Sequence, residues 1–148
     1  QVGGAVKNVL AIACGIIEGR ELGENARASL ITRGLSEITR LGVSRGARAE
    51  TFKGLAGIGD VMLTCTSLQS RNMSLGTDLG RGSTLGDILA ARKSVAEGVY
   101  TASAVVEHAE QLDVEMPISE AVDGILNHGA SIDDAIGGLL SRTFKTEN

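Results

Sequence analysis

The first stretch of the chain is its most concentrated run of apolar positions. Between residues 2 and 17 only Lys7 and Asn8 carry polar side chains. A segment that is apolar all round is typical of a helix in the middle of a domain, because a surface helix has one polar face. On such a helix three apolar residues share the face of Lys7, at spacings of three, four and seven: Leu10, Ala11 and Cys14. The pattern predicts a lysine held in the core.

A lysine in this position has two interpretations. Burial disfavours the charged form of an amine, which turns a lysine into a usable proton donor and acceptor. Alternatively, the stem of Lys7 packs in the core while its ammonium reaches the surface. The apolar run from Val9 to Ile17 is far shorter than the ~18–20 residues that cross a membrane. We therefore expect no membrane insertion.

Helical periodicity continues after a polar, glycine-containing connection over residues 18–24. Asn25 can cap a second helix. The apolar positions of this helix recur at spacings of four, three and three: Ile31, Leu35, Ile38 and Leu41. Arg33 and Glu37 are expected to form an exposed pair four residues apart. Gly42 and Gly46 are expected to end the helix.

Glycine punctuates the middle of the chain. A short helical piece is expected around residues 50–55, and Ser70 could begin another helix. The glycine-rich run over residues 75–83 is typical of a flexible segment. Thr84 can cap a brief helix that ends at Ala91.

Three more helices are expected in the last third of the chain. The first has inward positions Val99, Ala102, Val106 and Ala109. Pro117 fits the first turn of the next, with Ile118, Val122 and Ile125 facing inward. Ser131 and Asp134 resemble a capping box for the last helix, and residues 141–148 are expected to fray. Without strand-like alternation, the class is all-α, and residues 1–148 form a single domain.

Composition and charge limit the classes of ligand that the chain is expected to bind. Of 148 residues, 43% are hydrophobic and 22% charged, and the formal net charge is −4. This balance is typical of a globular protein and provides no basic surface for nucleic acid. Two cysteines indicate a reducing compartment rather than a disulfide framework. His108 and His128 lack the spacing of a metal site, so we expect no metal.

Two further segments contain polar residues that could bind a ligand or assist Lys7. Asp60 follows the spaced glycines of Gly54-Leu55-Ala56-Gly57-Ile58-Gly59. It is either a helix N-cap or a carboxylate that orients Lys7. Ser70-Arg71-Asn72 offers a hydroxyl, a guanidinium and an amide at an expected helix start, which suits a phosphate. On these three residues alone, an ordinary capped helix is the preferred interpretation. No G-x-G-x-x-G fingerprint of a dinucleotide site is present.

Several segments together resemble one family. They are Gly3-Gly4-Ala5-Val6-Lys7-Asn8, Leu22-Gly23-Glu24-Asn25, the Gly54 to Asp60 run, Leu63-Thr64-Cys65-Thr66-Ser67, Ser70-Arg71-Asn72, Val95-Ala96-Glu97-Gly98 and Glu115-Met116-Pro117-Ile118. In this order, and over essentially the whole chain, they are similar to the C-terminal, substrate-binding domain of bacterial-type NAD(P)-dependent glycerol-3-phosphate dehydrogenases. The resemblance implies a helical domain of the 6-phosphogluconate-dehydrogenase-like C-terminal type.

The resemblance also implies roles for individual residues. Lys7 takes the position of the family's acid/base lysine in the interconversion of dihydroxyacetone phosphate and glycerol 3-phosphate, which feeds phospholipid synthesis in the cytoplasm. Asn8, Asp60, Ser70, Arg71 and Asn72 take positions that contact the substrate. Arg71, Val95 and Glu97 take positions that also meet NAD or NADP.

The main departure from the family is the absence of a nucleotide-binding (Rossmann) domain from this sequence. The chain begins without methionine, directly on an apolar helix, so we expect it to be part of a longer protein. Alone it should have negligible turnover, because positioning of the reactants is worth ~7–11 kcal/mol in favourable cases. We also expect a homodimer, although apolar helices fit a core and a dimer face alike.

Two alternative functions remain open. The chain could be the helical half of a ketopantoate reductase or of a 6-phosphogluconate type dehydrogenase, whose substrates carry different anions. It could also be a non-catalytic helical dimerisation module in which Lys7 is structural.

Overall fold

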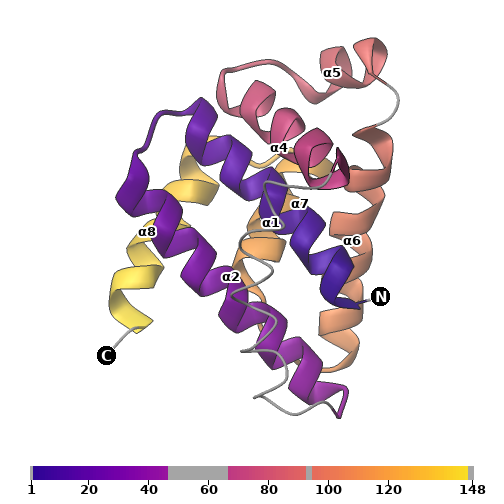
Figure 1. Ribbon diagram of the computed structural model, residues 1–148, viewed down its shortest axis with the longest axis vertical. Helices are drawn as coiled ribbons and strands as arrows, with labels where there is room; N and C mark the ends of the chain where they lie inside the picture. Colours follow the sequence, from indigo (N-terminus) through magenta and orange to yellow (C-terminus); the bar gives the residue numbers. More distant parts are fainter. Residues whose placement is uncertain (1, 47–66, 93–94, 147–148) are drawn as a thin grey trace.

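The protein is a bundle of α-helices. The computed structural model describes residues 2–46, 67–92 and 95–146, and within these ranges every regular element is a helix (Figure 1). In chain order the helices are α1 (Val2–Gly19), α2 (Glu24–Ser44), α4 (Ser67–Gly80), α5 (Leu85–Ala91), α6 (Ala96–Gln111), α7 (Pro117–Asn127) and α8 (Ile132–Thr146). The all-α prediction is confirmed for this part of the chain. The helical piece expected around residues 50–55 lies outside it.

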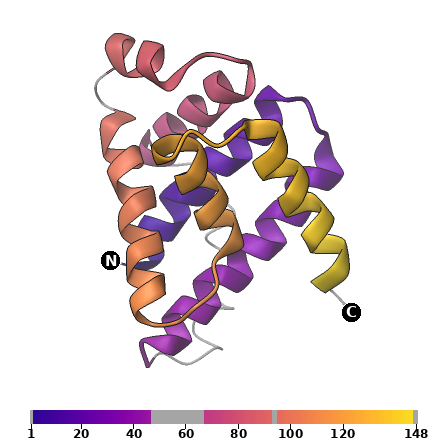
Figure 2. The ribbon, with the colours of Figure 1, turned by 180° about the vertical axis from the view of Figure 1, so that it is seen from behind.

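Helix α1 is the centre of the bundle. It contacts α2, α4, α6 and α7, and α6 and α7 are seen most clearly from behind (Figure 2). Every residue from Val9 to Ile17 is buried, as its apolar sequence predicts. No helix in the described ranges is long and apolar enough to cross a membrane.

Helices α1 and α4 touch through glycine. A Cβ added at Gly15 would overlap the carbonyl oxygen of Met73, and one added at Gly76 would overlap that of Ile12. Gly19 and Gly80 repeat this arrangement one turn later on each helix. Glycine is therefore needed along this contact, because any side chain would push the two backbones apart.

This contact corrects the prediction of a flexible segment over residues 75–83. Helix α4 continues through Gly80, and Leu75 and Leu79 are buried against the core. The glycines that indicated flexibility are the points where α4 meets α1. The predicted cap of the next helix is confirmed, since the backbone N–H of Asp87 donates to Oγ1 of Thr84 over 3.2 Å.

Helix α2 differs from its prediction in two ways. It begins at Glu24 after Gly23, whose φ is +97°, and Asn25 is not its cap. Its buried face also contains Glu37, which is 0% exposed, so the predicted surface pair of Arg33 and Glu37 is wrong. Glu37 lies at helical spacing from Gly34 and Leu41, within the apolar stripe.

The inward positions of α6 and α7 are confirmed only in part. Ala102, Ala109, Ile118 and Val122 are buried as predicted. Val99, Val106 and Ile125 are half-buried, and on α6 the inward stripe instead includes Gly98 and Val105. The stripe is therefore rotated slightly from the one that the sequence spacing predicts.

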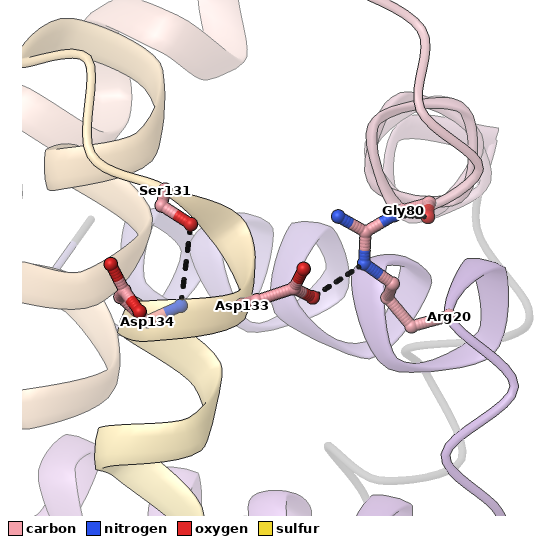
Figure 3. A network of polar contacts seen from close by, with 5 residues as sticks. All are labelled: Arg20, Gly80, Ser131, Asp133 and Asp134. Atoms are coloured by element: carbon pink, nitrogen blue, oxygen red, sulfur yellow. Dashed lines mark hydrogen bonds and ion pairs between the residues drawn. The ribbon is translucent and has the colours of Figure 1, made fainter.

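Helix α8 is fixed to the rest of the bundle at its first turn. Arg20, just after α1, donates from Nε to Asp133 over 3.0 Å and from Nη1 to the carbonyl oxygen of Gly80 over 2.6 Å (Figure 3). Asp134 N–H donates to Oγ of Ser131 over 3.4 Å, which confirms the predicted cap. The fraying expected over residues 141–148 is not found as far as Thr146, because α8 continues to that residue, and the last two residues lie outside the described part of the chain. No glycine or proline follows Gly138 to stop it.

Candidate functional site

The candidate site residues of the described chain lie on three helix segments that contact one another: the start of α1, the start of α4 and the start of α6. Helices α1 and α4 run in the same direction, since the carbonyl oxygens of Ile12 and Ile16 lie against Gly76 and Gly80 in turn. Asn8 is one helical turn before Ile12, and Asn72 is one turn before Gly76. The two asparagines therefore stand at the same level along the contact between the helices.

Lys7 is adjacent to this level, in the second turn of α1. Its face is the predicted one, because Leu10, Ala11 and Cys14 are all buried. Lys7 itself is half-buried, so its expected enclosure in the core is only partial. It stands at the margin of the core, where a long side chain keeps its stem among apolar groups and its ammonium can reach a ligand.

The candidate phosphate residues span the first and second turns of α4. Helix α4 begins at Ser67, so Ser70 is in its first turn and Arg71 and Asn72 follow. The first four residues of a helix carry the backbone N–H groups without a helical partner. Ser70 is thus the last residue with such an N–H group, whereas the backbone N–H groups of Arg71 and Asn72 lie within the helical hydrogen-bond pattern, so these two would bind an anion through their side chains. Arg71 is exposed, whereas Asn72 is only 4% exposed.

The start of α6 forms the third part of the site. Val95, the N-cap residue, is 2% exposed and belongs to the core, while Glu97 in the first turn is exposed. A cofactor could thus meet the Glu97 side chain but only the backbone of Val95.

A polar clamp joins this start to α4. Arg92 donates to Oγ of Ser74 over 2.8 Å and forms an ion pair of 2.6 Å with Asp78. The backbone N–H of Val95 in turn donates to the carbonyl oxygen of Arg92 over 3.3 Å. The first turn of α6 is therefore linked through Arg92 to the helix that carries Arg71 and Asn72.

The structure thus brings together the segments that carry Lys7, Asn8, Arg71, Asn72 and Glu97. Asp60 lies outside the described residues, so its predicted place beside Lys7 stays a prediction. The arrangement offers an amine, a guanidinium and amides at one margin of the core. These groups suit an anionic substrate that also exchanges a proton.

The sequence reasoning gave the wrong environment to Glu37 and no role to Gly98. Glu37 is a buried carboxylate away from this site, and its position in the apolar stripe of α2 was the signal available in the sequence. Gly98 lies against Asn72, with Oδ1 of Asn72 only 2.6 Å from the place of a Cβ. A glycine in the first turn of a helix was the signal, since glycine is unfavourable there without a packing reason.

Comparison with known proteins assigns the chain to a family. Residues 1–137 match the family model described as NAD-dependent glycerol-3-phosphate dehydrogenase C-terminus. Proteins called glycerol-3-phosphate dehydrogenase [NAD(P)+] from Parvibaculum lavamentivorans and Rhodospirillum rubrum are 58% and 59% identical over 147 residues. Each match covers 99% of this chain but 44% and 42% of the relative, so the chain spans less than half of their length.

A solved structure agrees with this assignment. The crystal structure of a glycerol-3-phosphate dehydrogenase from Coxiella burnetii matches with a TM-score of 0.84 and 44% sequence identity. The match covers 95% of this chain and 43% of that one. The helical arrangement described above is therefore shared with part of a longer protein.

Proposed function

Because the chain belongs to the family of NAD-dependent glycerol-3-phosphate dehydrogenase C-terminal domains, we propose that it forms the substrate-binding half of such an enzyme. In this proposal residues 1–148 are one domain of a protein that interconverts sn-glycerol 3-phosphate and dihydroxyacetone phosphate with NAD(H) or NADP(H). The main support is the half-buried Lys7, which lies next to Asn8 on α1 and at nearly the same height along the bundle as Asn72 on α4. The chain is also 58–59% identical to proteins called glycerol-3-phosphate dehydrogenase [NAD(P)+].

Lys7 is the proton donor and acceptor in this proposal. NAD(P)H, when bound, supplies the hydride that adds to C2 of the ketone. The ammonium of Lys7 then gives its proton to the former carbonyl oxygen, which leaves an alcohol and a neutral amine that regains a proton from water. In the oxidation direction the amine accepts the hydroxyl proton. The ammonium also stabilises negative charge on the oxygen during the transfer.

The remaining residues hold the substrate. Arg71 is suited to the phosphate, because its guanidinium can bind two phosphate oxygens at once. Asn72 adds a neutral donor to the phosphate, Ser70 is a further substrate contact on the same helix, and Asn8 stands beside Lys7. Asp60 is proposed to bind the hydroxyl end of the substrate or to orient Lys7.

The chain can form one wall of the cofactor site. Arg71 and Glu97 are exposed and could meet NAD(P), with Val95 contributing backbone only. Most of the cofactor would be held by the preceding part of a longer protein. The isolated chain is therefore expected to show negligible turnover, and robust NADH or NADPH oxidation by these 148 residues would contradict the proposal.

The test is a variant of the longer enzyme in which Lys7 is replaced. A suitable protein is a chimera in which this chain takes the place of the matching segment of the Rhodospirillum rubrum relative. Lys7→Met keeps the length of the side chain and removes the amine. We expect kcat with dihydroxyacetone phosphate to fall by about 10²–10⁴-fold, the usual contribution of a general acid or base. Arg81→Met, in an exposed turn, is the control.

Two outcomes would overturn this function. An unchanged kcat for Lys7→Met would make the lysine structural, as in a non-catalytic dimerisation module. Faster turnover of ketopantoate or 6-phosphogluconate than of glycerol 3-phosphate would assign the chain to another dehydrogenase type. The family match favours neither alternative.

The proposed assembly and location are a homodimer in the cytoplasm. Two cysteines in 148 residues fit a reducing compartment better than a disulfide framework. Light scattering of the longer enzyme would give its mass directly, and a monomer at micromolar concentration would contradict the dimer.

A further inference from the structure

Gly98 lies in the first turn of α6, facing the buried side chain of Asn72 on α4. A Cβ at Gly98 would stand 2.6 Å from Oδ1 of Asn72 and 3.7 Å from its Cγ. The amide nitrogen of Asn72 is not among the atoms nearest to that position, so the oxygen faces Gly98 and the nitrogen is farther away. The missing side chain at Gly98 thus leaves the space that the Asn72 amide occupies.

The first turn of α6 favours this orientation of the amide. The N-terminal end of a helix carries partial positive charge from its unpaired N–H groups. Val95, at the N-cap, has an apolar side chain and makes no side-chain cap hydrogen bond. Oδ1 of Asn72 lies beside Gly98, the third residue of α6, so it stands near this positive end, and the amide nitrogen lies farther from Gly98.

We propose that Gly98 is a positioning residue for substrate binding: it lets Asn72 lie with its oxygen against α6 and its amide nitrogen directed to the substrate phosphate. This inference rests on the proposed function, in which Asn72 contacts that phosphate. Gly98 does not touch the substrate in this scheme and acts through Asn72 alone.

Alanine at position 98 should displace the Asn72 amide without preventing folding. The two side-chain atoms that the new Cβ would meet first are Oδ1 of Asn72 and Cδ1 of Ile12, the latter at 3.3 Å. Both are ends of side chains that can rotate, unlike the backbone that faces Gly76. Asn72 is the closer of the two and must move.

The experiment is a double-mutant cycle in the longer enzyme. Gly98→Ala, Asn72→Ala and the double variant are compared with the parent in KM for dihydroxyacetone phosphate and in kcat. Loss of a hydrogen bond to a charged group should raise KM by about 10–100-fold in each single variant. If Gly98 acts through Asn72, adding Gly98→Ala to Asn72→Ala should change KM by less than about twofold. The change should appear in KM more than in kcat, because the bond is made in the ground state as well.

The control is Gly137→Ala on α8, where a Cβ would meet nothing within 4 Å. It should leave KM unchanged. Additive effects of the two substitutions on KM would overturn the inference, as would an unchanged KM in Asn72→Ala. A parent enzyme without turnover of dihydroxyacetone phosphate would instead overturn the proposed function.

Folding provides a second readout. If Gly98→Ala lowers the melting temperature, Asn72→Ala should restore it in the double variant, because the shorter side chain makes room for the new Cβ. Failure of this rescue would show that the obstruction is not Asn72, and would overturn the inference.

Discussion

Glu37 on α2 binds Ser119 at the start of α7. Its Oε1 accepts hydrogen bonds from the backbone N–H and the hydroxyl of Ser119, both at 3.3 Å, and its Oε2 accepts one from the N–H of Ile118 at 2.8 Å. A carboxylate from one helix thus caps another that is distant in sequence. Pro117 in the first turn carries no N–H, so these two N–H groups are among the donors that most need a partner.

Replacement of Glu37 should destabilise the fold strongly. Glu37→Ala leaves the N–H groups of Ile118 and Ser119 buried without their acceptor, at about 1–3 kcal/mol for each. We expect the free energy of unfolding of the chain to fall by at least about 2 kcal/mol in urea titration. Glu107→Ala, on the exposed side of α6, is the control and should change it by less than about 0.5 kcal/mol. Equal effects of the two substitutions would contradict the capping role.

Glu37 should also make stability depend on pH. Burial raises the pKa of Glu37 from 4.5 to about 7, against the lowering effects of the Ile118 and Ser119 hydrogen bonds and of the Arg40 charge. The folded chain therefore holds a proton between these values that the unfolded chain has released. The resulting stabilisation is complete below about pH 4.5 and is lost as pH rises to about 7, with a total of about 3 kcal/mol.

Glu37→Gln isolates this effect because glutamine does not titrate. The free energy of unfolding of the parent minus that of the variant should decrease between pH 5 and pH 7.5, with both proteins measured in the same buffers. Subtraction removes the contribution of all other titrating groups. A difference that increases with pH would mean that hydrogen bonding outweighs burial at this carboxyl.

The glycine contact between α1 and α4 should tolerate no side chain. Gly76→Ala places a Cβ on the carbonyl oxygen of Ile12, so the helices must separate. We expect a loss of at least about 2 kcal/mol in the free energy of unfolding, the range for an overpacked core. Gly138→Ala, at an open position of α8, should instead stabilise by about 0.5–1 kcal/mol through helix propensity. If both substitutions change the free energy of unfolding in the same direction, the proposed need for glycine at the contact between α1 and α4 is contradicted.

The two interactions of Arg20 should differ in strength. Its ion pair joins side chains that are 31% and 78% exposed, so Asp133→Asn should cost less than about 1 kcal/mol and still less in high salt. Arg20→Ala also removes the 2.6 Å hydrogen bond to the carbonyl oxygen of Gly80 at the end of α4, which is worth about 1.5–3 kcal/mol for a charged donor. Thermal unfolding of both variants measures the difference. A loss for Asp133→Asn as large as that for Arg20→Ala would contradict this ranking.

Local patterns predicted much of the helical structure. The apolar run of α1 predicted a central helix, since a helix that is apolar all round has to be covered on all sides. The caps at Thr84 and Ser131 were predicted because a cap depends only on residues within one turn. The candidate residues Lys7, Arg71 and Asn72 were also named from the sequence, through short motifs shared with a family.

The sequence by itself thus determined the all-helical class, several helices with their caps, the apolar face of Lys7 and the family. Only the tertiary structure decided that Glu37 is buried, that the glycines of α4 lie directly against the backbone of α1, and that Gly98 faces Asn72. The physical reason is that helical periodicity and caps are set within a few residues along the chain. The environment of a carboxylate or the use of a glycine is set by a neighbour from another helix.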